Sequence, residues 1–99
     1  MSKKALRMKE QDNVAVVLEP VSAGDVVCIM SKNETVDRIV AKDDIDTYHK
    51  IALIAFKNGD IVYKYGEVIG KTIQSIELGE HVHVHNIQGV SITDVYQGI

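Results

Sequence analysis

Hydrophobic residues along this chain occur in short runs, separated by polar residues together with glycine, asparagine or proline. The runs are rich in valine and isoleucine, which is typical of β-strands. We expect strands at residues 14–18, 26–30, 35–41, 49–56, 61–65, 68–72 and 81–86. No segment sustains the 3.6-residue periodicity of an amphipathic helix. The pattern therefore predicts an all-β domain built from many short strands.

A short motif marks three of the expected strand entrances. The order glycine, acid, any residue, valine occurs at residues 24–27, 59–62 and 79–82. Glycine permits backbone angles that a turn requires, and the acid can accept hydrogen bonds from nearby amides. The spacings between the three copies are unequal, so the motif predicts one local turn used three times and excludes a solenoid. The acidic run at residues 42–46 is expected to be a solvated loop.

Composition narrows the class of protein. A chain of 99 residues makes one domain, and 45% hydrophobic with 25% charged residues is typical of a globular protein. A net charge of −3 gives no electrostatic signature for nucleic acid. The single cysteine, Cys28, cannot form an intramolecular disulfide and is expected to be a small buried hydrophobe.

The chain ends and apolar runs bear on location and domain boundaries. The first residues lack the apolar core of a secretory signal, and no run approaches the roughly 20 apolar residues needed to span a membrane. We therefore expect a cytoplasmic protein that does not enter the membrane. Residues 1–11 are lysine-rich and weakly apolar, so we assign them to a flexible N-terminal arm and residues 12–99 to the domain.

The strongest candidate for chemistry is the stretch at residues 81–86. Three of the four histidines of the chain fall within five residues here, as His81, His83 and His85. In a strand these imidazoles would share one face, and Val82 and Val84 would point toward the core. Neutral imidazole is the commonest metal ligand, although a solvated polar face is an alternative reading.

Strand spacing limits how many of these histidines one ion can reach. Residues two apart lie about 6.6 Å apart along a strand, so an ion can bind two neighbours but not readily both His81 and His85. We expect a pair on the metal and the third histidine elsewhere. Such a site is incomplete and needs ligands from another strand, a partner chain or the substrate. His49 could approach this face, or it could be a structural residue at the rim.

A second candidate is the segment at residues 63–66. Two tyrosines and a lysine beside Gly66 would suit a carboxylate or polyhydroxyl substrate. Strand alternation would place Tyr63 and Tyr65 on one face and Lys64 on the other. A purely structural role for the tyrosines fits the pattern equally well.

Three segments, taken in order, resemble a known family. The letters HKIAL at 49–53, YGEVIG at 65–70 and GEHVHVHN at 79–86 are similar to the SAF domain of the altronate and galactarate dehydratase family, over roughly residues 12–89. The resemblance implies a β-clip fold and metal-dependent removal of water from sugar acids. It implies Fe2+ as the usual metal, with Mn2+ or Zn2+ as alternatives.

The resemblance also assigns roles to individual residues. It places the family's His-x-His-Asn motif on His83, His85 and Asn86, with both histidines implied to bind the metal or polarise the leaving hydroxyl. His81 is then the additional member of the trio. The resemblance implies substrate-side roles for Asn86, His49, and the pair Tyr65 and Gly66.

The same resemblance implies a partner. In most such dehydratases the SAF domain precedes a much larger domain in the same chain, whereas two-component altronate dehydratases and the sulfolactate sulfo-lyase have a free SAF subunit. We therefore expect a large dehydratase subunit that carries the main base, a sugar-acid or sulfolactate substrate, and no activity in the isolated chain. A non-catalytic carbohydrate-binding module is the alternative. Unpaired strand edges also allow a homo-oligomer.

Overall fold

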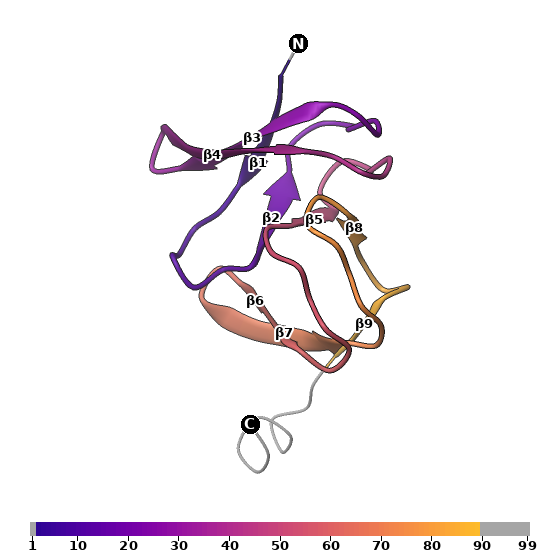
Figure 1. Cartoon of the computed structure of the whole chain (residues 1–99). Helices are drawn as coiled ribbons and strands as arrows, with labels where there is room; N and C mark the ends of the chain where they lie inside the picture. Colours follow the sequence, from indigo (N-terminus) through magenta and orange to yellow (C-terminus); the bar gives the residue numbers. More distant parts are fainter. Residues whose placement is uncertain (1, 90–99) are drawn as a thin grey trace.

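The computed structural model describes residues 2–89 and contains two β-sheets in this range (Figure 1). The strands are β1 (Lys3–Leu6), β2 (Val14–Val17), β3 (Val26–Ser31), β4 (Glu34–Val40), β5 (Lys50–Ala52), β6 (Ile61–Lys64), β7 (Glu67–Thr72), β8 (His81–Val82) and β9 (Ile87–Gln88). The larger sheet has the order β4-β3-β1-β2-β5-β8, and the smaller has the order β6-β7-β9. This architecture confirms the predicted all-β class. No helix among the described residues is long and apolar enough to cross a membrane.

Strand β1 lies in the region that the sequence assigned to a flexible arm. It runs parallel to β3 and antiparallel to β2, and therefore occupies the middle of the larger sheet. Its Ala5 is 0% exposed. The assignment of residues 1–11 to a flexible arm is wrong for residues 3–6. The strand was missed because only one small residue faces the core, and the strand depends on backbone pairing with two partners.

The core divides into two clusters of buried side chains. One cluster, which includes Ala5, Ile29 and Ile51, lies beneath the larger sheet, and the other includes Phe56, Val62 and Val82. Neighbouring residues of β5 belong to different clusters, since Ile51 packs in the first and Ala52 in the second. Strand β5 and its partner β8 therefore lie where the two halves of the molecule meet, as Figure 1 shows.

The glycine and acid motif forms the same turn at all three predicted places. Gly24, Gly59 and Gly79 have φ of +93°, +90° and +89°, which is the left-handed region that favours glycine. In all three turns, the acid that follows the glycine accepts a hydrogen bond from the amide three residues earlier: Asp25 from Ser22, Asp60 from Lys57 and Glu80 from Glu77.

A fourth turn has the same form but lacks the motif. Tyr48 takes the position of the glycine with φ of +68°, and His49 takes the position of the acid. The His49 amide donates to the Asp46 carbonyl (2.9 Å), as the Asp25 amide does to the Ser22 carbonyl (2.9 Å). An aromatic residue in this conformation is uncommon, and Tyr48 is 72% exposed. As a result, this turn places the His49 imidazole at the start of β5, in the position where the other three turns place a carboxylate.

Candidate metal and active site

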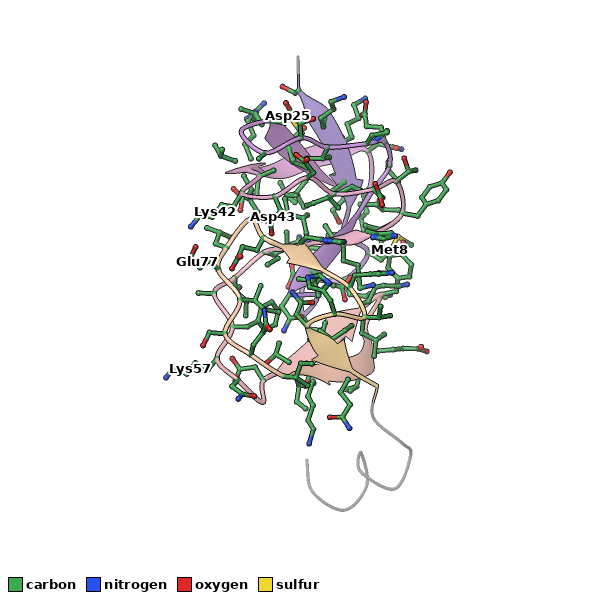
Figure 2. The ribbon with its side chains drawn as sticks, turned by 90° about the vertical axis from the view of Figure 1, so that its right-hand side faces the viewer. Met8, Asp25, Lys42, Asp43, Lys57 and Glu77 are labelled. Carbon is green, nitrogen blue, oxygen red and sulfur yellow. The ribbon has the colours of Figure 1, made fainter. Side chains whose placement is uncertain are left out.

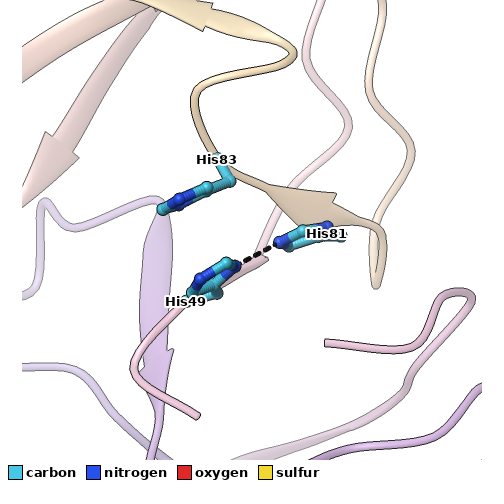
Figure 3. Close-up of side chains that lie close together, drawn as sticks. All are labelled: His49, His81 and His83. Carbon is cyan, nitrogen blue, oxygen red and sulfur yellow. Dashed lines mark hydrogen bonds between the residues drawn. The ribbon is translucent and has the colours of Figure 1, made fainter. Parts of the chain in front are cut away.

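Three imidazoles come together where β5 meets β8. His49 immediately precedes β5, His81 begins β8, and His83 follows it. Strands β5 and β8 pair antiparallel with Ile51 opposite His81, which brings the start of one strand beside the end of the other. Figure 3 shows the three rings lying close together, with His49 between the other two.

The expected histidine strand is much shorter than predicted. Strand β8 ends at Val82, and residues 83–86 form a turn. Val84 is 77% exposed, so the prediction that it points into the core is wrong. Strand alternation cannot continue because the chain reverses here to enter β9. Because the chain turns here, His83 and His85 lie outside β8, and the three histidines of this stretch do not lie along one strand.

The Asn86 side chain stabilises this turn through hydrogen bonds to its backbone. Its side chain is 3% exposed, donates through Nδ2 to the His81 carbonyl (2.7 Å) and accepts at Oδ1 from the His83 amide (3.0 Å). Its own amide donates to the His83 carbonyl (3.1 Å). These bonds fix the backbone on both sides of Val82. The observed contacts of Asn86 are therefore those of a positioning residue, and the substrate contact implied by the resemblance stays a prediction.

The spacing of the imidazole nitrogens is compatible with one metal ion. One nitrogen from each of His49, His81 and His83 lies within 4.8 Å of the others. Nitrogens that share an ion with bonds of about 2.0–2.1 Å are about 3–3.4 Å apart, so a small contraction suffices. The rings of His49 and His83 are stacked, with centroids 3.7 Å apart and planes 12° apart. Because the lone pairs lie in the ring planes, at least one ring must rotate to bind.

The hydrogen bonding of the cluster leaves donor atoms available. His49 Nδ1 and His81 Nε2 share a hydrogen bond of 2.8 Å, the dashed line in Figure 3. His83 Nδ1 is buried and has no hydrogen-bond partner among the described residues. A buried nitrogen without a partner costs stability, and a bound ion would satisfy it. Imidazole ligands suit Fe2+ and Zn2+. The donor set therefore fits the metals implied by the resemblance, with Mn2+ the least suited.

The electrostatics of the cluster favour neutral imidazoles. Burial lowers the pKa of His81, and the neighbouring His85, His49 and His83 lower it further, while Asp43 opposes them. The pKa of His83 is also lowered by burial, then by His49, Lys50 and His85, against Asp46. Only neutral imidazole can ligate a metal, and the lowered pKa values favour this form of His81 and His83.

These shifts predict an acid-sensitive fold in the metal-free protein. The folded pKa values of His81 and His83 lie below the unfolded value of about 6.5, so the unfolded chain binds more protons as the pH falls. The stabilisation is fully present above about pH 6.5 and is lost as the pH falls through the folded pKa values. Urea unfolding in EDTA at decreasing pH measures it. The matched His81→Gln, His83→Gln double variant should show a flatter profile, and an equally steep profile would contradict the assignment.

Lys50 adds positive charge beside the histidines, and Lys64 lies near Lys50. Lys50 lies on β5 opposite Val82, is half-buried, and has no salt bridge within residues 2–89. Its pKa is lowered by burial and then by the charge of Lys64. Lys50 in turn lowers the pKa of His83. The arrangement makes a cationic surface next to the imidazoles, which suits an anionic substrate.

The other predicted site residues lie outside the three-histidine group. His85 is exposed in the turn, with its ring centroid 4.8 Å from that of His81. The sequence set His81 apart from the pair of His83 and His85, whereas the structure groups His81 with His83 and sets His85 apart. Metal binding by His85 stays a prediction of the resemblance.

Tyr65 and Gly66 form the turn between β6 and β7, on the smaller sheet. They have φ of +56° and +79°, so Tyr65 leaves the strand alternation that the sequence predicted for it. The Gly66 amide donates to Asp12 Oδ1 (2.7 Å), and Lys64 Nζ lies 5.1 Å from the centroid of the Tyr65 ring. Through Lys64 and Lys50 this turn belongs to the same cationic surface, and its contact with substrate stays a prediction.

Sequence reasoning missed two contributors to the site. Lys50 is adjacent to His49 in the HKIAL segment, yet a lone lysine in a strand carries no signal of its own. Asp43 belongs to the acidic run that was expected to be solvated, but its Oδ2 accepts a hydrogen bond from the His81 amide (2.9 Å). Asp44 similarly accepts from the Ala23 amide (2.9 Å). Both contacts join segments far apart in the chain, which local patterns do not report.

The fold and site define an all-β domain with a three-histidine cluster at a strand junction, the class of small domain that can hold a metal. Within that class, a sequence profile of the altronate/galactarate dehydratase SAF domain matches residues 3–90, and the chain belongs to this family. The match confirms the resemblance drawn from the three segments. It also begins nine residues before the expected boundary at residue 12, in agreement with the position of β1.

Relatives of two kinds are similar to the chain. Altronate dehydratase of Bacillus subtilis (strain 168) is 37% identical over 93 residues, which are 94% of this chain and 18% of that protein. The (2R)-sulfolactate sulfo-lyase subunit alpha of Paracoccus pantotrophus is 46% identical over 61 residues, 62% of this chain and 91% of that subunit. The corresponding subunit of Chromohalobacter salexigens is 40% identical over 75 residues, 74% of this chain and 79% of that subunit. This chain thus spans under a fifth of the altronate dehydratase.

Proposed function

We propose that this chain is the SAF component of a metal-dependent hydro-lyase of the altronate dehydratase type, which works with a separate large subunit. The observation that carries the proposal is the grouping of three imidazole nitrogens within 4.8 Å at the junction of β5 and β8. Similarity to altronate dehydratase over 94% of this chain supports the reaction class. The two-subunit arrangement is supported by relatives that are themselves named subunit alpha.

The metal is assigned to His49, His81 and His83, with Fe2+ as the first candidate. When bound, a divalent metal supplies Lewis acidity toward substrate oxygens. The three side chains lie in or directly beside β5 and β8, so these two strands together set their separation. Asn86 and Asp43 hold the backbone at His81 and His83, and thereby orient two of the three ligands.

The cationic side chains are assigned to the substrate. In the dehydration, the C–H bond next to the carboxylate breaks, a C=C bond forms, and the C–O bond on the adjacent carbon breaks to release water. The resulting enol then tautomerises to the 2-oxo acid. Lys50 and Lys64 attract the carboxylate and stabilise the negative charge that develops as the proton leaves. His85, exposed beside His81, donates a proton to the departing hydroxyl. The base that removes the proton is assigned to the large subunit, because the three clustered imidazoles are assigned to the metal and His85 to the leaving group.

A second candidate is the small subunit of a sulfolactate sulfo-lyase. It is favoured by the match to 91% and 79% of the length of two such subunits. Both reactions start with loss of the proton next to a carboxylate, and they differ in the group expelled, which is hydroxide or sulfite. The same histidines and lysines serve either reaction, so the substrate assay decides between them.

The test is an assay of the chain copurified with a large dehydratase subunit from the same genome. We expect metal-dependent turnover of altronate, measured as formation of a 2-oxo acid, whereas sulfite release from sulfolactate would favour the second candidate. Lys50→Gln should lower kcat/KM about tenfold or more, because a charged hydrogen bond to the carboxylate is lost. Lys57→Gln is the matched control and should leave kcat/KM unchanged, because Lys57, labelled in Figure 2, is an exposed lysine that has no assigned role in the site. If a metal-loaded complex turns over neither acid, the proposed activity is wrong, and a non-catalytic binding module is the remaining interpretation.

A further inference from the structure

A groove lies between the segment after β1 and the turn that joins β3 to β4. It has a volume of about 350 Å³ and is lined by Arg7, Met8, Lys9, Lys32 and Val36, among others. An adjoining hollow of about 370 Å³ shares Arg7, Met8, Lys9 and Lys32. These volumes match the lower end of small-molecule sites. The groove shares no residue with the histidine cluster. In Figure 2, Met8 and Asp43, the latter bound to the His81 amide, are well separated.

The groove carries positive charge that the protein does not neutralise. Arg7, Lys9 and Lys32 line it, and none of them forms a salt bridge within residues 2–89. Glu10 and Glu34 also line the groove, but neither is paired with these cations. Three cations against two carboxylates leave a net positive charge in the groove. Such a surface attracts an anion.

One donor of a residue that lines the groove lacks a partner. Arg7 Nε is buried and makes no hydrogen bond among the described residues. An unsatisfied buried donor is costly, and more so on a charged group. The Nε–H and one Nη–H of a guanidinium form two parallel donors that match the two oxygens of a carboxylate. The free edge of Arg7 therefore indicates the kind of group that is missing.

The walls of the groove are already ordered. The Arg7 amide donates to the Met30 carbonyl (2.9 Å), which ties the segment to the end of β3. The amides of Met8 and Lys9 both donate to Asp12 Oδ2 (3.1 Å each). Opposite them, Lys32 and Asn33 form a tight two-residue turn with φ of +51° and +65°. A ligand would therefore bind with little ordering of the backbone.

We propose that this groove binds a small carboxylate-bearing molecule, held by the Nε edge of Arg7 and by Lys9 and Lys32. The apolar surfaces of Met8 and Val36 would contact its methylene carbons. The groove uses none of the residues assigned to the metal or to the substrate, although the Lys9 side chain lies against Gly66 of the β6–β7 turn. It gives a role to residues 7–10, which the sequence placed in a flexible arm.

The two arginines of the chain allow a direct test. In the 15N-labelled full-length chain, Arg7 and Arg38 give separate Nε–Hε resonances, and Arg38 is exposed on β4, so it serves as an internal control. Titration with succinate should shift the Arg7 resonance saturably and leave that of Arg38 unchanged. Succinamide at matched ionic strength is the neutral control, and inorganic phosphate tests whether any oxyanion suffices. A stronger response to phosphate than to succinate would overturn the carboxylate assignment.

Two variants separate binding from folding. Arg7→Lys keeps the charge but removes the paired donors of the guanidinium, and should weaken succinate binding about tenfold or more. Binding to this variant is measured from the shifts of the backbone amide resonances around the groove. Lys32→Asn removes a charge while accepting the positive φ of the turn, so it should weaken binding without loss of the fold. Lys42→Gln, whose side chain pairs with Glu77 elsewhere, is the charge control and should bind normally. Absence of a saturable shift at Arg7, or unchanged affinity in both groove variants, would overturn the proposal.

Discussion

Replacing His81 with alanine is expected to remove the bound metal, whereas replacing His85 with alanine should leave it in place. One ring nitrogen of His81 belongs to the group of nitrogens within 4.8 Å, and no nitrogen of His85 does. Changes in residues that merely support a ligand cost about 10–100-fold in metal affinity. Loss of a ligand should therefore cost on the order of 100-fold or more. Metal content after gel filtration and titration of the apo-protein with Fe2+ or Zn2+ measure the effect.

The pair of variants also separates the two assignments of the site. If His83 and His85 hold the metal, as the family motif implies, His85→Ala loses it and His81→Ala retains it. If His49, His81 and His83 hold it, the outcome is reversed and His49→Ala behaves like His81→Ala. His85→Ala should still lower turnover in the complex, since this residue is proposed to donate a proton to the leaving group. Both variants change exposed or half-buried side chains, so thermal unfolding should stay close to that of the parent.

Replacing Asn86 with alanine is expected to be the most destabilising change near the site. The substitution removes the side-chain bonds to the His81 carbonyl and the His83 amide, and leaves both groups without partners beside a buried residue. The free energy of unfolding should fall by about 2–3 kcal/mol, from one buried donor and one buried acceptor left unsatisfied. Urea denaturation measures this loss.

Metal affinity should fall in the same Asn86→Ala variant, because His81 and His83 lose their backbone support. Asn58→Ala, in an exposed turn remote from β8, is the matched control and should change stability by less than about 0.5 kcal/mol. Asn86→Asp is a second variant, which keeps the acceptor for the His83 amide, loses the donor to the His81 carbonyl and adds a buried negative charge. Unchanged stability and metal affinity in both Asn86 variants would show that the turn does not depend on this side chain.

The outcome at β8 and β1 shows where local pattern reasoning fails in this protein. Alternation of histidine and valine predicts a strand through residue 86, but the strand ends at Val82 because Asn86 closes a turn through contacts with the preceding residues. In β1 the error is in the other direction. A segment with one buried alanine has almost no hydrophobic signal, and it becomes a central strand because β2 and β3 supply its hydrogen bonds.

The sequence by itself determined the all-β class, the family, three of the four related turns, and the histidine-rich stretch as the place for chemistry. These features depend on residue type and near-neighbour spacing, such as glycine where φ must be positive. Only the tertiary structure decided which histidines meet. His49 and His81 are 32 residues apart, and their nitrogens are joined by a hydrogen bond of 2.8 Å. The register of β5 against β8 produces that contact, and register is set by packing across the sheet, which no local pattern contains.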